Sequence, residues 1–185
     1  MYKTVCVTNR HLVKGDFQDQ IKKVLDMNPE AVILREKDLN EEEYEKLGKL
    51  VVKLCKDKNV PCYFNTFVAS AIKLKADGVQ VPFRQFCLMS PEEKQKAGRA
   101  GVSVHSPEEA EEAEKRGADF LIYGHIFETD CKKGLEPRGI RALENICRHS
   151  GIPVFAIGGI NEQNQQLCFD AGAACVCRMS SLMTD

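Results

Sequence analysis

A histidine in the second half of this 185-residue sequence stands where proton-transfer chemistry is feasible. His125 ends the apolar run of residues 120–123 and follows Gly124, which gives a ligand close access to the imidazole. Imidazole exchanges protons near neutral pH, so His125 is a candidate general acid and base. A structural histidine that only satisfies hydrogen bonds fits this position as well, and position alone leaves both interpretations open.

Glycines and serines near the C-terminus have the chemistry of a phosphate site. Gly158 and Gly159 precede Asn161, which we predict to be a helix N-cap, so that backbone N–H groups and the helix dipole face an anion. The next apolar run ends in further candidates for phosphate binding, namely Met179, Ser180 and Ser181. A tight turn that needs glycine for its backbone alone is the alternative.

Cations and neutral polar side chains follow other apolar runs. Arg35 and Lys37 alternate with Glu36, so both cations can project to one side, ready for a carboxylate or a phosphate. Lys132, in a later loop, could close over an anion. A surface charge cluster that Glu36 neutralises is the alternative. The remaining candidates for substrate binding are Asn65, Ser103 and His105.

These candidates fall at the ends of short strands that alternate with helices. Strands are predicted at residues 3–8, 31–35, 61–65, 78–81, 101–105, 120–125, 153–158 and 175–180. The clearest helix spans residues 40–56, where apolar residues recur every three or four positions. Ser90 and Ser106 are each followed by Pro-Glu-Glu, which is typical of a helix start.

Repeated strand–helix units predict an α/β protein with a parallel sheet. Gly117 and Gly172, just past two predicted helices, permit a left-handed cap before the chain re-enters the sheet. The eight predicted strands favour a compact (β/α)8 TIM barrel, one domain over residues 1–185, with its final helix missing or truncated. An open doubly wound sheet is the alternative, but the first strand is not followed by its G-x-G-x-x-G turn. In a barrel, the candidate residues converge on one rim.

The composition argues against several classes of function. The 26 basic and 27 acidic residues give a net charge of −1, whereas a protein that binds nucleic acid or a membrane surface needs a cationic face. No apolar run approaches the roughly 20 residues of a membrane-spanning helix, and the first residues lack the apolar core of a signal peptide. We therefore expect a cytoplasmic protein, and leave open whether it forms a homo-oligomer.

Nine cysteines are scattered along the chain without a CxxC pair, unlike a secreted disulfide framework. We expect buried free thiols and a reducing compartment. Cys175 and Cys177 would share one face of a strand, either as half of a metal clip or as small apolar packing groups. No second pair or nearby histidine completes a metal site, so packing is the prediction.

Several of these segments resemble the thiamine phosphate synthase/TenI superfamily. The matching segments follow one another along nearly the whole chain, at residues 34–37, 101–106, 156–160 and 179–180. The run Tyr-Gly-His-Ile-Phe-Glu-Thr-Asp-Cys-Lys-Lys-Gly-Leu-Glu at residues 123–136 is similar to the TenI branch, because synthases typically carry Pro where His125 stands.

Departures from the synthase pattern point in the same direction. Ile33 stands where synthases generally carry Gln, and Thr66 stands where they carry an Asp that helps to hold magnesium. A second magnesium Asp is expected shortly after the fourth strand, but residues 81–86 contain no carboxylate. A diphosphate substrate needs Mg²⁺ to neutralise it, so the synthase reaction is doubtful here. Arg178, where the family is usually apolar, either reinforces the phosphate site or faces outward.

The TenI resemblance implies a thiazole tautomerase, an isomerase of thiamine biosynthesis. It would convert a non-aromatic thiazole carboxylate phosphate into its aromatic tautomer, with His125 carrying the proton and with no metal or cofactor. The glycine pair and Ser180 would hold the phosphate, while Arg35, Lys37 or Lys132 would face the carboxylate. The alternatives are a thiamine phosphate synthase and a non-catalytic, regulatory protein that binds a thiazole or thiamine phosphate.

Overall fold

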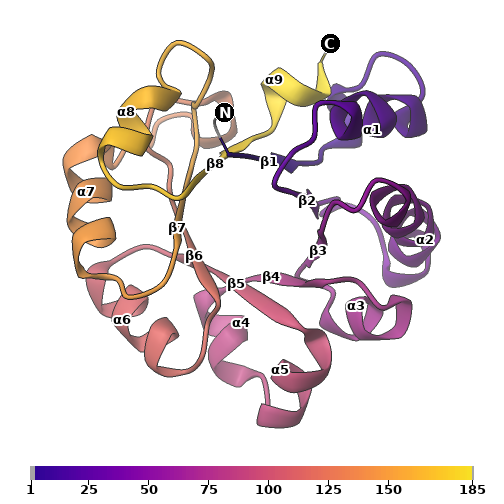
Figure 1. Cartoon of the computed structure of the whole chain (residues 1–185), viewed down its shortest axis with the longest axis horizontal. Helices are drawn as coiled ribbons and strands as arrows, with labels where there is room; N and C mark the ends of the chain where they lie inside the picture. Colours follow the sequence, from indigo (N-terminus) through magenta and orange to yellow (C-terminus); the bar gives the residue numbers. More distant parts are fainter. Residues whose placement is uncertain (1–2, 185) are drawn as a thin grey trace.

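Eight parallel strands close into a barrel in which each strand pairs with the next along the chain and β8 pairs with β1 (Figure 1). This computed structural model describes residues 3–184, apart from the side chain of Cys131, so residues 1, 2 and 185 of the predicted domain lie outside the described part. The strands are β1 (Thr4–Val7), β2 (Ala31–Leu34), β3 (Cys62–Asn65), β4 (Gly78–Pro82), β5 (Arg99–Val104), β6 (Phe120–Gly124), β7 (Val154–Ile157) and β8 (Cys175–Arg178). All eight overlap the predicted ranges, and the TIM-barrel prediction is confirmed.

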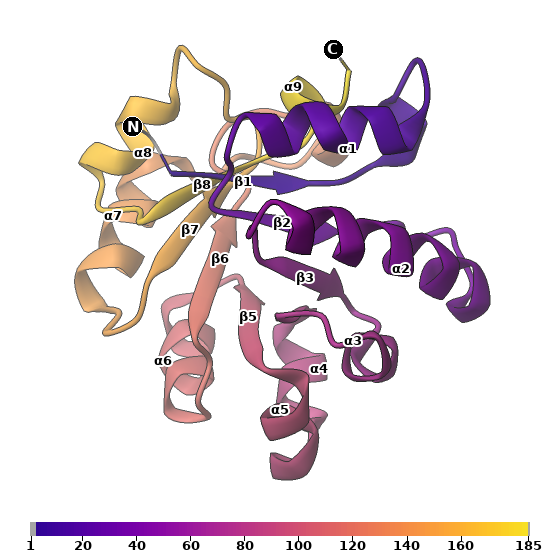
Figure 2. The same cartoon turned by 45° about the vertical axis from the view of Figure 1, so that its right-hand side comes forward.

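Helices surround the barrel and follow the strands in turn (Figures 1 and 2). They are α1 (Phe17–Asp26), α2 (Glu41–Asp57), α3 (Val68–Leu74), α4 (Phe83–Leu88), α5 (Pro91–Ala97), α6 (Pro107–Lys115), α7 (Gly139–His149), α8 (Gln165–Asp170) and α9 (Ser180–Met183), with short 3-10 helices η1 (Arg10–Leu12) and η2 (Asp130–Lys132). Asn40 and Ser90 cap α2 and α5 in capping boxes, and Ser106 caps α6. The predicted starts at Ser90 and Ser106 are therefore confirmed.

Two apolar clusters fill the inside and the outside of the barrel wall. Alternate strand residues point inward, and the interior cluster consists of Val5, Val7, Ala31, Ile33, Tyr63, Phe120, Ile122, Phe155, Cys175 and Cys177. A larger cluster joins the outward faces of the strands to the helices. Because both faces of each strand are buried, the strands are almost continuously apolar. Cys175 and Cys177 pack in the interior cluster, as predicted.

The loop before α8 bears on the predicted cap at Asn161. The regular helix begins at Gln165, and Asn164 precedes it without a side-chain capping bond. Asn161 makes the capping bonds on the turn that leads into α8: its side chain accepts from the backbone N–H groups of Gln163 and Asn164, and its carbonyl accepts from Gln165 N. The last helix among the described residues, α9, is a single turn. Gly117 and Gly172 follow α6 and α8 with positive φ angles of 86° and 96°, as the left-handed cap requires.

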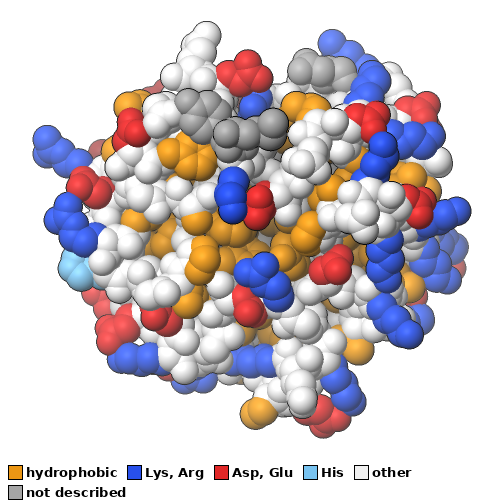
Figure 3. Space-filling view, in the orientation of Figure 1, with side chains coloured by type: hydrophobic (Ala, Val, Ile, Leu, Met, Phe, Trp, Pro, Cys, Tyr) orange, Lys and Arg blue, Asp and Glu red, His pale blue; other side chains and the backbone are white. Residues whose placement is uncertain are grey.

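The surface carries charges of both signs. In the orientation of Figure 1, apolar side chains lie in the middle of the visible face, and cationic and anionic side chains both occur around its edge (Figure 3). This mixture on one face agrees with the near balance of acidic and basic residues. Within residues 3–184, none of the helices combines the length and the apolar character that a membrane crossing needs.

Candidate active site

His125 follows β6 and lies directly against the glycine pair at the end of β7. The side chain is nearly buried, with 9% of the residue exposed, and its Nε2 atom lies 3.2 Å from the carbonyl oxygen of Leu135. When Nε2 donates to this carbonyl, Nδ1 is the nitrogen that can accept a proton. A Cβ atom at Gly158 would collide with the Cβ of His125, so a side chain at 158 would displace the imidazole.

The segment after β6 is held along the end of β7 by backbone hydrogen bonds. Ile126 N donates to Ile157 O at 3.0 Å, and Phe127 N donates to Gly158 O at 3.0 Å. A Cβ at Gly159 would strike Glu128 O and Phe127, so both glycines let this segment pass close by. The proton-carrier candidate and the phosphate candidates therefore lie side by side.

Arg138, which the sequence did not single out, anchors the backbone on both sides of His125. Its Nε donates to Gly124 O at 3.0 Å, its Nη1 to His105 O at 2.7 Å, and its backbone N–H to His125 O at 2.9 Å. The guanidinium also lies over the ring of Tyr123. Arg138 thus links the ends of β5 and β6 to the start of α7 by hydrogen bonds. No local sequence pattern predicts this role.

The ends of β7 and β8 present free amide donors. Within residues 3–184, the backbone N–H groups of Gly159, Ser180 and Ser181 have no acceptor in the protein. Asn164 fixes the loop after β7 by donating to Gly159 O at 2.9 Å. Ser180 and Ser181 are the first residues of the single-turn α9, whereas Gly159 lies in the loop before α8.

Three cations gather near the ends of β2 and the loop after β6. Arg35 and Lys132 both lower the pKa of Lys37, Arg35 most strongly, followed by burial and then Lys132. Within the described part of the chain, none of the three lies within ion-pair distance of a carboxylate. Glu36 does not neutralise them, because it is buried with Arg10 and Thr8. The alternative of a neutralised surface cluster is therefore not what the structure contains.

Neutral polar side chains cross the barrel interior on β3, β4 and β5. Asn65 Nδ2 donates to Gln80 Oε1 at 2.7 Å, and Gln80 Nε2 donates to Ser103 Oγ at 2.7 Å. Asn65 and Ser103 are thus linked through Gln80, a residue that the sequence did not single out. Gln80 could have been recognised from the sequence, because it is a polar residue inside a predicted buried strand.

His105 is not brought to this group. Its imidazole Nδ1 lies 3.4 Å from Glu109 Oε2 at the start of α6, and about half of its side chain is exposed. Met179, by contrast, packs against the interior cluster at the end of β8, next to the free amides. Of the predicted site residues, His105 is the one that turns to a partner on an outer helix.

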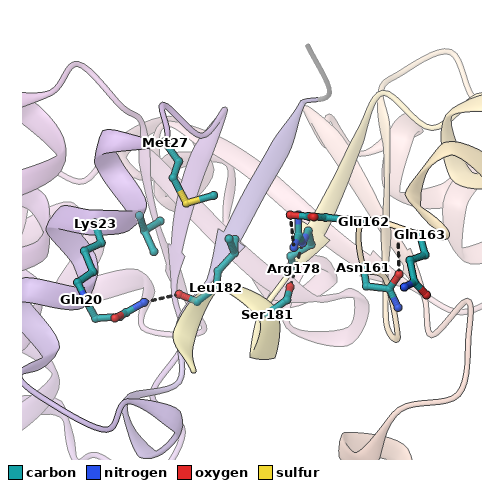
Figure 4. A pocket seen from close by; sticks show the side chains of 10 residues that line it. Gln20, Lys23, Met27, Asn161, Glu162, Gln163, Arg178, Ser181 and Leu182 are labelled. Atoms are coloured by element: carbon teal, nitrogen blue, oxygen red, sulfur yellow. Dashed lines mark hydrogen bonds and ion pairs between the residues drawn. The ribbon is translucent and has the colours of Figure 1, made fainter. Parts of the chain in front are cut away.

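Arg178 faces outward, into a cavity of about 810 Å³ between α1 and the loop after β7 (Figure 4). Its Nε donates to Ser181 Oγ at 2.9 Å, and its Nη2 lies 3.6 Å from Glu162. The hydroxyl of Ser181 is therefore engaged on the outer side of the barrel, and only its amide is free for the rim. The cavity opens beside the single-turn α9, whose Ser181 and Leu182 line it.

The residues present do not fit a magnesium site at the ends of β3 and β4. Thr66 donates its hydroxyl to Asn65 O at 2.7 Å, and Gln85 Nε2 donates to Thr66 O at 2.7 Å, so neutral groups occupy this edge. Ile33 is buried in the apolar interior. Within the described residues, no group of three or more His, Cys, Asp or Glu side chains is placed to hold a metal ion.

Comparison with known proteins gives one consistent family. Residues 4–182 match the family model TMP-TENI, described as thiamine monophosphate synthase. A protein of Aquifex aeolicus named putative thiamine-phosphate synthase 2 is 34% identical over 90% of this chain and 90% of its own length. The thiamine-phosphate synthase of Clostridium acetobutylicum is 30% identical over 99% of this chain and 88% of its own.

A solved structure extends this likeness to three dimensions. The thiamine phosphate pyrophosphorylase of Pyrococcus furiosus superposes with a TM-score of 0.85 at 30% identity, covering 99% of this chain and 88% of that one. The backbone likeness therefore spans the barrel and the rim on which the candidate residues lie.

Proposed function

The chain belongs to the thiamine monophosphate synthase/TenI family, and within it we propose that the protein is a thiazole tautomerase. The observation that carries the proposal is the contact between His125 and Gly158. It puts the imidazole beside the loop that carries the free amide of Gly159, and the free amide of Ser180 follows β8, the strand that pairs with β7; such amides suit a phosphate.

The proposed reaction moves one proton across the thiazole. His125 starts neutral, takes the proton from ring C2 at Nδ1, and the electron pair left behind spreads over the conjugated ring. The imidazolium then returns a proton to the exocyclic carbon, so the ring becomes aromatic and His125 is neutral again. A positioned acid–base group of this kind contributes about 10²–10⁴-fold to the rate.

The three cations Arg35, Lys37 and Lys132 would stabilise the negative charge that develops on the substrate during proton transfer. The carboxylate of the substrate is bonded to C2, so negative charge that develops there on deprotonation extends into it. Arg35, Lys37 and Lys132 have no carboxylate partner within residues 3–184, so they can face this group. Preorganised charges aimed at developing charge lower the barrier without reorganising. A metal ion is not part of the proposal.

Thiamine phosphate synthase is the second candidate, because the relatives carry that name. It would be a transferase that joins a pyrimidine diphosphate to a thiazole phosphate. Against it stands the neutral edge formed by Thr66 and Gln85, where carboxylates would hold Mg²⁺ for the diphosphate.

Two assays on the wild-type protein separate these candidates. The first supplies the non-aromatic thiazole carboxylate phosphate and follows aromatisation by ultraviolet absorbance in the presence of EDTA. The second supplies the pyrimidine diphosphate, thiazole phosphate and Mg²⁺ and measures thiamine phosphate. We expect turnover in the first assay only. Turnover in the second alone would make the protein a synthase, and binding without turnover in either would make it a regulatory binder.

A further inference from the structure

The acidic residues next to Arg35, Lys37 and Lys132 are bound by cations outside that group: Glu36 and Asp38 by Arg10, and Asp130 by Lys133. Glu36 is 2% exposed and accepts from Thr8 Oγ1 at 2.7 Å, from Arg10 N at 3.1 Å and from Arg10 Nη1 at 3.2 Å. Asp38 accepts from Arg10 Nη1 at 2.7 Å and also pairs with Arg10 Nη2. Near Lys132, Asp130 pairs with Lys133 at 3.2 Å.

Arg10 therefore pairs with the two carboxylates that would otherwise be the nearest ion-pair partners of Arg35 and Lys37 in the sequence. Glu36 lies between Arg35 and Lys37 in the sequence, and Asp38 follows directly. Without Arg10, Glu36 would have no cationic partner among the described residues, and Asp38 would keep only the imidazole of His11, 3.0 Å away. Water could not screen Glu36, because the residue is buried.

We propose that Arg10 is a specificity-determining residue, which binds Glu36 and Asp38 and so leaves Arg35 and Lys37 open to the carboxylate of the ligand. The identity of that ligand rests on the proposed function. Arg10 itself acts through Glu36 and Asp38, so it is a positioning residue. The lowered pKa of Lys37 agrees with this arrangement, since a nearby free carboxylate would raise it.

The test measures ligand affinity by calorimetry. The probes are the aromatic thiazole carboxylate phosphate and the same thiazole phosphate without its carboxylate. We expect Arg10→Met to weaken the first by about tenfold and the second by less than about twofold, because the field of Glu36 acts on the carboxylate end. Arg148→Met is the matched control, since among residues 3–184 Arg148 pairs only with the exposed Glu144 on α7, and it should leave both affinities unchanged.

The double variant Glu36→Gln/Asp38→Asn separates this role from a contribution to folding, because it removes both carboxylates that Arg10 binds. If Arg10 acts by neutralising these carboxylates, adding Arg10→Met to the double variant should leave the affinity for the carboxylated probe nearly unchanged. Neither the double nor the triple variant contains a buried unpaired carboxylate at position 36, so the comparison holds even if Arg10→Met alone does not fold. Equal losses for both probes, or a tenfold loss on adding Arg10→Met to the double variant, would overturn the proposal.

Inorganic pyrophosphate serves as a probe that does not depend on the proposed function. If the wild type binds pyrophosphate with the same dependence on Arg10 and Glu36, but binds neither thiazole, the proposed function fails and the role of Arg10 stands. If the thiazole carboxylate binds and Arg10→Met has no effect on either anion, the role of Arg10 fails alone.

Discussion

Gly158 leaves room for His125 to lie directly against the end of β7. Its φ of 100° is strained for any other residue, and an added Cβ would collide with the Cβ of His125. We expect Gly158→Ala to lower kcat at least tenfold and to lower the free energy of unfolding by about 1–3 kcal/mol.

Gly117 offers a matched control for Gly158. Its φ of 86° is similar, but an added Cβ would meet nothing within 4 Å. Gly117→Ala should therefore cost stability through the backbone alone and keep kcat. Steady-state kinetics and urea unfolding of both variants test this, and equal kcat in the two would argue against crowding at His125.

Arg138 positions His125 through the carbonyls on either side of it. We expect Arg138→Met to lower kcat more than it changes KM and to shift the pH–rate profile, because the imidazole loses its fixed place while phosphate binding remains. Arg138→Lys should recover part of the rate, since one cationic donor is kept. If Arg138→Met lost stability without moving the pH–rate profile, its role would be structural only.

The lowered pKa of Lys37 leads us to expect that anion binding depends on pH. Arg35, burial and Lys132 lower the pKa of Lys37, so its amine loses a proton below the ordinary lysine pKa of about 10.4. Anion binding favours the charged amine, so affinity for pyrophosphate should fall as the pH rises toward that value. Calorimetry on wild type and Lys37→Met checks this, and an identical fall in both would exclude Lys37 as the cause.

The sign is opposite for the stability of the free protein. The folded chain holds the Lys37 proton less tightly than the unfolded chain does. Between the folded and the unfolded pKa the unfolded state binds more protons, so the contribution of Lys37 to the free energy of unfolding rises with pH there. A bound anion favours the charged amine of Lys37 in the folded protein, so in its presence this rise of the unfolding free energy with pH should disappear.

At the scale of elements, α2 fixes the ends of two neighbouring strands. The hydroxyl of Tyr44 donates to Leu34 O at 2.5 Å and accepts from Asn65 N at 3.2 Å, and burial raises its pKa strongly. Tyr44→Phe leaves both backbone groups without this partner, which should cost about 1–3 kcal/mol of unfolding free energy. Urea unfolding measures the loss.

Tyr63→Phe is the control for this prediction. Among the described residues, the hydroxyl of Tyr63 accepts only a long 3.4 Å contact from Arg99, and the rest of the ring packs inside the barrel. Its loss should cost less than that of the Tyr44 hydroxyl. A larger loss for Tyr63→Phe would show that the link between β2 and β3 contributes little.

The sequence predicted those elements whose signals are local. Asn40, Ser90 and Ser106 cap helices through bonds to residues three positions on, so their roles follow from spacing. At the start of α8, Asn161 Oδ1 accepts from Asn164 N and Asn164 Oδ1 accepts from Asn161 N, so the capping bonds that spacing predicts at Asn161 form, although the regular helix begins only at Gln165.

The parts of the site that escaped prediction depend on distant segments. Arg10 meets Glu36 across 26 residues, and Arg138 meets His105 across 33. No pattern within a helix or a strand signals such contacts. The rim itself could be predicted, because parallel strands in a barrel end on one face.

At the scale of the whole molecule, the closed barrel brings several cations together, although the chain as a whole is almost neutral. The chain has a net charge of −1, yet Arg35, Lys37 and Lys132 meet without a carboxylate partner among the described residues. These cations come from the end of β2 and the loop after β6, while His125 follows β6 and the glycine pair follows β7. Only barrel closure in chain order brings these segments to one rim.

The most direct test of the account compares wild type with His125→Gln in the aromatisation assay with EDTA. Glutamine can still donate a hydrogen bond to Leu135 O, as Nε2 of His125 does, but it cannot carry a proton. We predict a rate lower by about 10²–10⁴-fold with little change in KM and an unchanged melting temperature. A variant that aromatises the thiazole as fast as the wild type would contradict the account.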